Sequence, residues 1–291
     1  MSDDTMTSVP AAIAVDAAGP DTTAERVGRF FDEKGDVLGD LMGGNVHFGY
    51  WLGPDDDSTF AEAADRLTDH MIDMLRPRPG DRVLDLGCGR GRPAVRLAQA
   101  AEVEVVGISV SRRDVAAATA LARAEGVADR VTFRYADAMN PPFTAGSFDR
   151  VWAVESMLYM PDRLQVLRNI AALLRPGGRL ALCDISETPP ETAEDRAVLE
   201  GILREWEVHS LARFDDYPRL IAAAGLRLTD IVDVSDRTRY SPDRVVELFQ
   251  RLVAGSGIPV ESVDLPMELW DRSFAAFERM GYLIAAAERA G

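Results

Sequence analysis

Apolar and polar positions in the middle of the chain follow two periods. Short apolar runs alternate with longer stretches in which apolar residues recur every three or four positions. The short runs predict buried strands and the longer stretches predict helices, since these are the periods of the two structures. The predicted strands cover 83–86, 103–108, 131–135, 147–154 and 179–185, and the helices between them cover 93–100, 111–125 and 161–174. Strands joined by helices in this way imply right-handed crossovers and a mostly parallel sheet.

The segments that flank this alternation are less regular. Residues 1–21 have little apolar periodicity and are expected to form a disordered tail. A helix is predicted over 22–40, and Thr59 with Glu62 forms a capping box that opens a second helix, stopped by Pro77. Further helices are predicted over 192–206, 217–224, 242–254 and 266–280, and further strands over 226–234 and 282–287.

These elements predict an α/β protein with a doubly wound, seven-stranded, mostly parallel sheet. Residues 22–291 are expected to form a single domain. Helical insertions that lie outside the strand-helix alternation are expected to form a lid over the sheet. The lid elements are 22–56, 187–212 and 236–280.

Composition excludes several classes of partner. The chain has 291 residues, with 32 Lys and Arg against 48 Asp and Glu, so its formal charge is −16. This balance argues against nucleic acid and against a polybasic membrane surface. No apolar run approaches the ~18 residues of a membrane helix, and no Lys or Arg precedes Arg26, so a cytoplasmic protein is expected. Cys88 and Cys183 have no metal-ligand spacing, and no metal site is expected.

A glycine-rich loop follows the first predicted strand. Gly87, Gly89 and Gly91 occur at every second position, which lets the backbone approach a ligand at a helix N-terminus. A nicotinamide dinucleotide site would place its third glycine at position 92, where this chain has Arg92. It would also place an acidic residue at the end of the second strand, where the chain has Ser109. A nicotinamide-dependent oxidoreductase is therefore disfavoured.

Four motifs in order resemble those of the class I S-adenosylmethionine (SAM) dependent methyltransferases. They are Leu84-Asp85-Leu86-Gly87-Cys88-Gly89-Arg90-Gly91, Tyr135-Ala136-Asp137-Ala138, Ser147-Phe148-Asp149 and Leu174-Arg175-Pro176-Gly177-Gly178. The resemblance implies a Rossmann-like fold and SAM as the cofactor. The segments 47–51 and 107–109 resemble the branch that acts on small molecules, including rebeccamycin-type sugar O-methyltransferases and isoprenoid-diphosphate C-methyltransferases.

The resemblance also implies which residues bind SAM. Asp137 is expected to accept a hydrogen bond from the adenine amine, and Glu155 is expected to face the sulfonium. Asp85 either contacts the ligand or only fixes the glycine loop, and both alternatives stay open. Gly91 and Trp51 are expected beside the bound cofactor. The full set of expected cofactor residues is Tyr50, Asp85, Gly87, Gly89, Ser109, Asp137, Ala138, Val154 and Glu155.

The acceptor is less well defined by the motifs. Sugar O-methyltransferases of this group carry two adjacent histidines where this chain has Leu158 and Tyr159, so no histidine base is expected there. Glu155, Tyr159 and Asp184 are the candidate catalytic residues. The resemblance to isoprenoid C-methyltransferases favours a carbon of an allylic or homoallylic diphosphate. A hydroxyl or amine of a sugar or other natural product is the alternative, and a SAM-binding partner protein without turnover is a third hypothesis.

A diphosphate acceptor would need a local cationic site in this acidic chain. The candidates are Arg90, Arg92, Arg112 and Arg113 beside the SAM loops, and Arg204 and Arg213 in the lid. Aromatic rings that could steady an allylic cation are Phe30, Phe31, Trp152, Tyr159 and Trp206. His47 and His209 are weaker pocket candidates, and His70 is expected to be solvated. The partner is expected to be a small-molecule acceptor, and the oligomeric state stays open, a homo-oligomer included.

Overall fold

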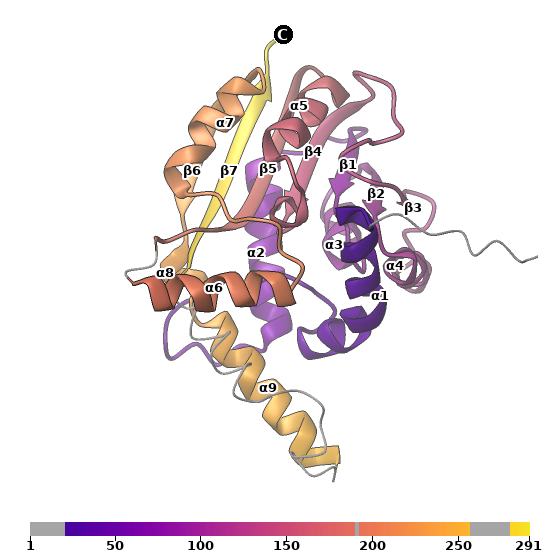
Figure 1. The fold of residues 1–291 in the computed structure, drawn as a ribbon. Helices are drawn as coiled ribbons and strands as arrows, with labels where there is room; N and C mark the ends of the chain where they lie inside the picture. The colour runs from indigo at the N-terminus through magenta and orange to yellow at the C-terminus, as the bar shows by residue number, and fades with distance from the viewer. Residues whose placement is uncertain (1–20, 190–191, 257–279) are drawn as a thin grey trace, which may run out of the picture.

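A seven-stranded sheet forms the centre of the computed structural model, which describes residues 21–189, 192–256 and 280–291 (Figure 1). The strand order is β3-β2-β1-β4-β5-β7-β6. β7 pairs antiparallel with both of its neighbours, and the other pairings are parallel. The strands are β1 (Arg82–Leu86), β2 (Glu104–Ser109), β3 (Val131–Tyr135), β4 (Phe148–Val154), β5 (Leu174–Ser186), β6 (Leu226–Asp233) and β7 (Gly281–Arg289).

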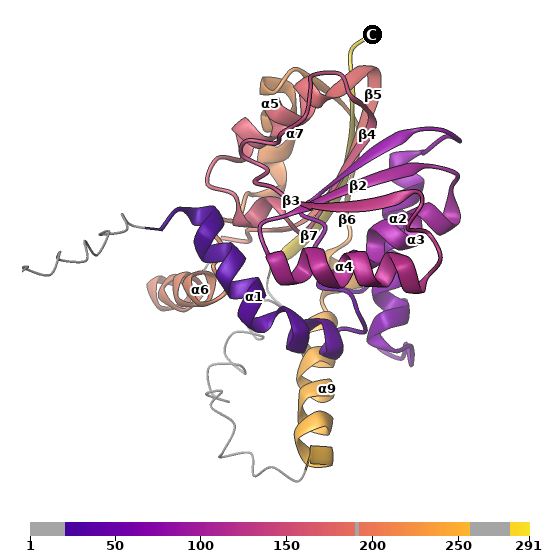
Figure 2. The ribbon, with the colours of Figure 1, turned by 90° about the vertical axis from the view of Figure 1, so that its right-hand side faces the viewer.

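Helices cover both faces of the sheet, as Figure 2 shows. One apolar layer lies between the sheet and α2, α3 and α4, and a second layer lies between the sheet and α5 and α7. The helices are α1 (Thr23–Leu41), α2 (Phe60–Leu75), α3 (Arg92–Ala100), α4 (Arg112–Ala124), α5 (Arg163–Leu173), α6 (Ala193–Glu205), α7 (Tyr217–Ala223), α8 (Ser235–Thr238) and α9 (Ser241–Ser256), with short 3-10 turns η1 (Met157–Tyr159) and η2 (Phe214–Asp216). No helix in the described part of the chain has both the length and the apolar character needed to cross a bilayer.

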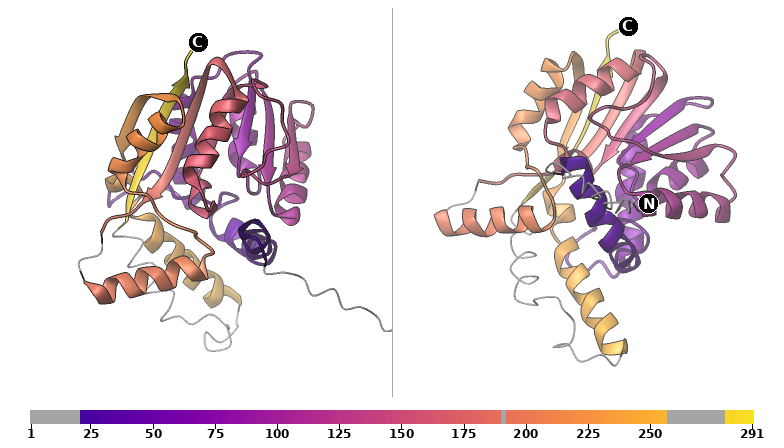
Figure 3. Two further views of the ribbon diagram at one scale, coloured as in Figure 1. Left: turned by 45° about the horizontal axis from the view of Figure 1, so that its top comes forward. Right: turned by 45° about the vertical axis from the view of Figure 1, so that its right-hand side comes forward.

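Helices α1, α6 and α9 lie beyond the carboxyl ends of the parallel strands (Figure 3). A capping box in which Thr22 and Glu25 satisfy each other's backbone amides starts α1. Asp32 then ties α1 to the start of α4, because its carboxylate accepts hydrogen bonds from Ser111 Oγ at 2.6 Å and from the Arg113 amide at 3.0 Å. α1 is therefore fixed beside the carboxyl end of β2, where α4 begins.

The predicted α/β fold with seven strands is confirmed. β5 begins at Leu174, earlier than the predicted start at Arg179, because Leu174 pairs with Phe148 across a register shift in β4. The predicted tail at 1–21 and helix at 266–280 fall outside the described residues apart from their last positions. The lid role of 22–56, 187–212 and 236–280 stays a prediction.

Candidate functional site

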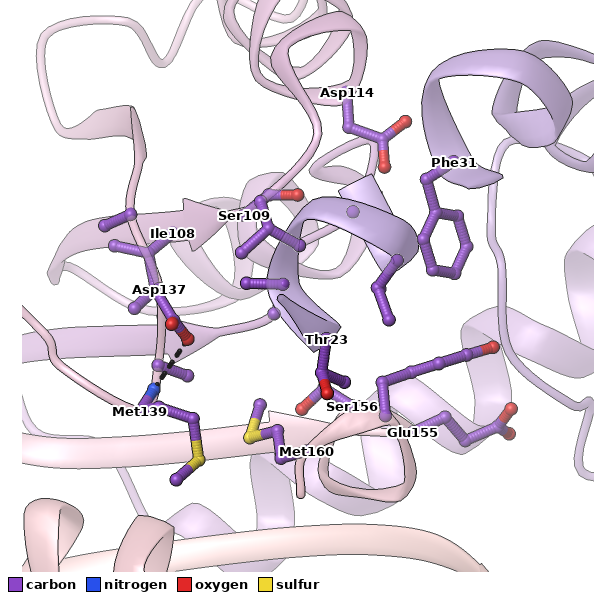
Figure 4. A pocket seen from close by; sticks show the side chains of 18 of the residues that line it. Thr23, Phe31, Ile108, Ser109, Asp114, Asp137, Met139, Glu155, Ser156 and Met160 are labelled. Carbon is purple, nitrogen blue, oxygen red and sulfur yellow. Dashed lines mark hydrogen bonds between the residues drawn. The ribbon is translucent and has the colours of Figure 1, made fainter. Parts of the chain in front are cut away.

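A cavity of about 300 Å³ lies between α1 and the carboxyl ends of β1 to β4. This is the topological switch point of the sheet, where ligands bind in doubly wound folds. Figure 4 shows Asp137 and Met139 at one end of the cavity and Glu155 and Phe31 toward the other. The sequence-predicted site residues that line it are Gly87, Gly89, Ser109, Asp137, Ala138, Val154, Glu155 and Tyr159.

The glycine loop after β1 leaves room at the cavity. Gly87 has a φ of +86°, and a Cβ there would lie 2.3 Å from the Ser156 Cβ, so only glycine fits. Gly89 has a φ of +46°, yet a Cβ there would meet no atom within 4 Å. The loop therefore presents open backbone to a ligand at Gly89. Gly91 does not line the cavity; it packs against Ala118 of α4 and Phe133 of β3.

Asp137 is held at the end of β3 by its own loop. Its Oδ1 accepts a hydrogen bond from the Met139 amide at 2.8 Å, drawn as a dashed line in Figure 4. Asn169 of α5 donates to the Ala138 and Met139 carbonyls at 3.2 and 2.9 Å, which fixes the rest of the loop. Oδ2 of Asp137 accepts no hydrogen bond from a described residue, so it can accept one from a ligand.

Asp114 is a cavity residue that the sequence analysis missed. It lies in the first turn of α4 and is 2 % exposed, and its Oδ1 has no hydrogen-bond partner among the described residues. Burial raises the pKa of this carboxyl group to about 6, opposed by the Arg90 guanidinium and reinforced by the charge of Asp32. The available signal was its position in the first turn of α4, after the N-cap Ser111. Because the end of β2 carries Ser109 and no carboxylate, an acidic side chain in that turn was a candidate for the same role.

Glu155 follows β4 in a left-handed conformation, with a φ of +42°. Its amide donates to the Cys183 carbonyl at 3.0 Å, and its Oε1 accepts hydrogen bonds from the Phe48 amide and from Tyr282 Oη, both at 2.6 Å. Burial raises the pKa of Glu155 to about 8. The two short hydrogen bonds hold the Glu155 carboxyl group in one orientation. A left-handed backbone at a non-glycine residue and a strongly raised pKa are both common at functional sites.

Aromatic rings cover the cavity near Glu155. Phe31 of α1 packs edge-to-face on Tyr159 with ring centroids 5.2 Å apart, and both residues line the cavity. Phe30 packs on Trp206, which follows α6, with centroids 6.1 Å apart. Burial raises the pKa of the Tyr159 hydroxyl, so it stays protonated at neutral pH. The sequence analysis named these rings, but not the N-cap Thr22 or the α1 residues Thr23, Ala24 and Val27, which also line the cavity.

The structure places Asp184 and Asp85 outside the cavity. Asp184 is 1 % exposed, accepts a hydrogen bond from Tyr217 Oη at 2.9 Å and lies 3.8 Å from the Arg163 guanidinium. Successive residues of a strand face opposite sides, and Asp184 faces α5 and α7 while Cys183 faces the side of Glu155. Asp85 is 2 % exposed and does not line the cavity, and its Oδ2 has no described partner.

Tyr50 and Trp51 also lie away from the cavity. The Tyr50 amide bonds to the Ala63 carbonyl of α2, and its ring packs on His70 with centroids 4.2 Å apart. Trp51 is 1 % exposed and donates from Nε1 to Ser241 Oγ at 3.0 Å. At these two positions the chain packs against α2, so Tyr50 and Trp51 cannot close over the cavity in this arrangement.

The predicted basic residues do not reach the cavity either. Arg90 and Arg92 pair with carboxylates of α1 and α2, and Arg112 stacks on Tyr135 at 4.1 Å. Arg113, Arg204 and Arg213 are likewise not among the lining residues, and neither are the three histidines; His47 is buried with a pKa lowered to about 4 by burial. Across residues 21–189, 192–256 and 280–291, the acidic and basic side chains that line the cavity are those of Asp114, Asp137 and Glu155, and all three are carboxyl groups. The same residues contain no group of side chains suited to hold a metal ion.

Comparisons with known proteins agree on one family. A family model described as a methyltransferase domain matches residues 83–178. The chain is 39 % identical over 267 residues to methyltransferase GfsG of Streptomyces halstedii, covering 92 % of this chain and 95 % of that protein. It is 39 % identical over 274 residues to 27-O-demethylrifamycin SV methyltransferase of Amycolatopsis mediterranei, covering 92 % and 98 %.

Solved structures show the same architecture. The [4+2]-cyclase SpnF superposes with a TM-score of 0.79 at 31 % identity, covering 93 % of this chain and 98 % of that chain. Geranyl diphosphate C-methyltransferase of Streptomyces coelicolor superposes with a TM-score of 0.72 at 20 % identity, covering 94 % and 100 %, which indicates a shared fold.

Proposed function

The chain belongs to the SAM-dependent methyltransferases that act on natural products, and from that premise we propose that it methylates a hydroxyl group of an acceptor that carries no diphosphate. The observation that supports this acceptor is the charge of the cavity. Its described lining offers carboxyl groups and no cationic side chain. A diphosphate in such a cavity would be repelled, whereas a hydroxyl needs a base, which a carboxylate can be.

The cavity fits SAM. SAM supplies an electrophilic methyl group on a cationic sulfonium. The open backbone at Gly89 would receive the methionine portion, and the free Oδ2 of Asp137 would accept from the adenine amine. The buried Oδ1 of Asp114, which lacks a partner among the described residues, would accept from the ribose hydroxyls beside Ser109. Val154 and Glu155 would then lie near the sulfonium.

For methyl transfer, the protein would align the acceptor with the methyl group, exclude water from the cavity and provide a base. Phe31 and Tyr159 exclude water from the acceptor end of the cavity. Oε1 of Glu155 is occupied by the Phe48 amide and Tyr282, so Oε2 is the oxygen that would take the acceptor's proton. A carboxylate whose pKa is raised to about 8 is a stronger base than an exposed one, and it matches its task near neutral pH.

A labelled-SAM assay tests the acceptor class. The panel contains neutral hydroxylated polyketides, glycosides, aminosugars and prenyl diphosphates, the last with and without Mg²⁺. We expect methyl transfer to a hydroxyl of a neutral member. Glu155→Gln should lower turnover by about 10²–10⁴-fold, the usual contribution of a general base, with little change in SAM affinity. Glu104→Gln, at the exposed amino end of β2, is the matched control and should keep wild-type turnover.

A carbon of an isoprenoid diphosphate is the second candidate. The Phe31 and Tyr159 rings beside Glu155 could steady an allylic cation. Transfer to prenyl diphosphates alone would favour this candidate and contradict the proposal. SAM binding without transfer to any member of the panel would instead support a partner protein without turnover.

A further inference from the structure

Two donors that are distant in sequence hold one oxygen of Glu155. The Phe48 amide precedes α2, and Tyr282 lies in β7, outside the methyltransferase-domain match at 83–178. Both donate to Oε1 at 2.6 Å. The Tyr282 ring stacks on the Phe48 ring with centroids 6.0 Å apart, so the two donors also fix each other.

Tyr282 is fixed on its other side as well. The residue is 1 % exposed, and its Oη lies 3.3 Å from Cys183 Sγ in the neighbouring strand β5. When Oη donates its proton to Glu155, the Cys183 thiol can donate to Oη in turn. The hydroxyl therefore sits between a thiol and a carboxylate, with its single proton aimed at Oε1.

This arrangement decides where Glu155 can carry a proton. An oxygen that already accepts two hydrogen bonds is a poor site for protonation, because the new proton would displace a donor. The proton of neutral Glu155 therefore belongs on Oε2. Glu155 lines the cavity, so a fixed Oε1 leaves Oε2 as the oxygen available to an acceptor.

We propose that Tyr282 is a positioning residue for methyl transfer, which holds Oε1 of Glu155 so that Oε2 receives the proton of the acceptor hydroxyl. The inference rests on the proposed function of Glu155 as the base. In the step, the acceptor O–H bond breaks and its proton passes to Oε2. The acceptor oxygen forms a bond to the methyl carbon, and the carbon–sulfur bond of the sulfonium breaks to leave neutral S-adenosylhomocysteine.

Other titratable groups around Glu155 act on it in different ways. Tyr282 and Cys183 face it from β7 and β5, Tyr159 faces it from η1, and the charge of Asp184 reaches it from the far side of β5. Burial raises the pKa of Glu155 most, the Tyr282 and Phe48 hydrogen bonds lower it, and the Asp184 charge raises it. Tyr282 is thus the side chain among the described residues that stabilises the ionised form directly.

An infrared pH titration of the full chain, with neither cofactor nor acceptor, tests the contact. The carboxylic acid band that disappears in Glu155→Gln belongs to Glu155. Tyr282→Phe removes one charge-assisted hydrogen bond to the ionised form, so the midpoint of that band should move to higher pH by about one to two units. An unchanged midpoint would overturn the proposal. Tyr217→Phe is the matched control, because Tyr217 is also buried and donates to a carboxylate, that of Asp184. It should not move the Glu155 midpoint to higher pH, because weaker ionisation of Asp184 can only lower the Glu155 pKa.

A second variant covers the case in which Tyr282→Phe does not fold. Fluorotyrosine at position 282 is a stronger donor of nearly the same size, so it should move the midpoint to lower pH, and no movement would again refute the contact.

Kinetics separate this inference from the proposed function. If the infrared midpoint moves, the acidic limb of the kcat profile should move with it at unchanged KM for SAM. A limb that stays in place would show that Glu155 is not the base, although Tyr282 holds it.

Discussion

Replacing Asp85 with Asn should make the stability of the folded chain less dependent on pH. Asp85 lies near the end of β1 at 2 % exposure, and its Oδ2 has no hydrogen-bond partner among the described residues. Burial raises its pKa to about 7, and the indole of Trp152 in β4 offsets only part of this rise. The unfolded chain titrates Asp near pH ~3.9, so the folded chain binds this proton more tightly.

The size of the effect follows from linkage. The stabilisation by the neutral carboxyl is complete below the unfolded pKa and is lost as the pH rises through the folded pKa of about 7. Each pH unit in this window changes the free energy of unfolding by up to about 1.4 kcal/mol, so the wild type loses about 3 kcal/mol through Asp85 between pH ~5 and ~8. Asn does not ionise, but its buried NH₂ lacks a partner, which costs about 1–3 kcal/mol at every pH.

Urea unfolding between pH 5 and 8 measures this difference. The free energy of unfolding of Asp85→Asn, minus that of the wild type, should rise by about 3 kcal/mol across the series. Asp56→Asn is the matched control. Hydrogen bonds from Arg66 and the Leu52 amide hold the pKa of Asp56 below its usual range, so its contribution is constant above pH ~5 and the control difference should be flat. A flat difference for Asp85→Asn as well would refute the reasoning.

Three further outcomes follow from the site. Asp32→Ala removes the contacts of α1 to Ser111 and Arg113, so calorimetry should show SAM affinity reduced about tenfold, and unchanged affinity would contradict the role of α1 in closing the cavity. Asp184→Asn should lower the free energy of unfolding by about 1–3 kcal/mol in urea titrations and leave turnover per folded molecule unchanged; lost turnover at full stability would return Asp184 to the site. SAM binding near pH 7 should release protons, because a nearby cation favours ionised Glu155; calorimetry in buffers of different ionisation enthalpy should show this release, and it should be smaller in Glu155→Gln.

The strands were predictable because their signals are local. The runs at 83–86 and 103–108 are mostly apolar, with one charged residue in each, Asp85 and Glu104, as expected of strands covered on both faces, and each ends in a turn or helix start. The place of β7 between β5 and β6 was not predictable, because no local pattern records which edge a final strand joins. Its antiparallel pairing, with Cys183 opposite Ile284 and Asp184 opposite Leu283, is a long-range property.

The residues of the candidate site also divide into those with a local sequence signal and those that only the fold brings to the site. The glycine loop and Asp137 were found from contiguous motifs, and the structure brings them to one cavity. Tyr282 meets Glu155 across 127 positions of sequence, so nothing in its own segment marked it. Asp114 had one local signal, its place in the first turn after the N-cap Ser111, but its burial is a long-range property. Asp184 shows the opposite case: a carboxylate near the end of a strand was expected at the site, but the alternation of the strand turns its side chain toward Tyr217 and away from the cavity.

The charge of the cavity wall gives the acidic composition of the chain a local role. Carboxyl groups of Asp114, Asp137 and Glu155 line it, and no cationic side chain does so in the part of the chain that the structure describes. Such a wall attracts a sulfonium cation, and methyl transfer turns that cation into a neutral thioether. The attraction therefore falls as the reaction proceeds, so the wall favours SAM over S-adenosylhomocysteine without any contact with the acceptor. A neutral acceptor leaves this discrimination intact, whereas a diphosphate would oppose it with two or more negative charges in the same cavity.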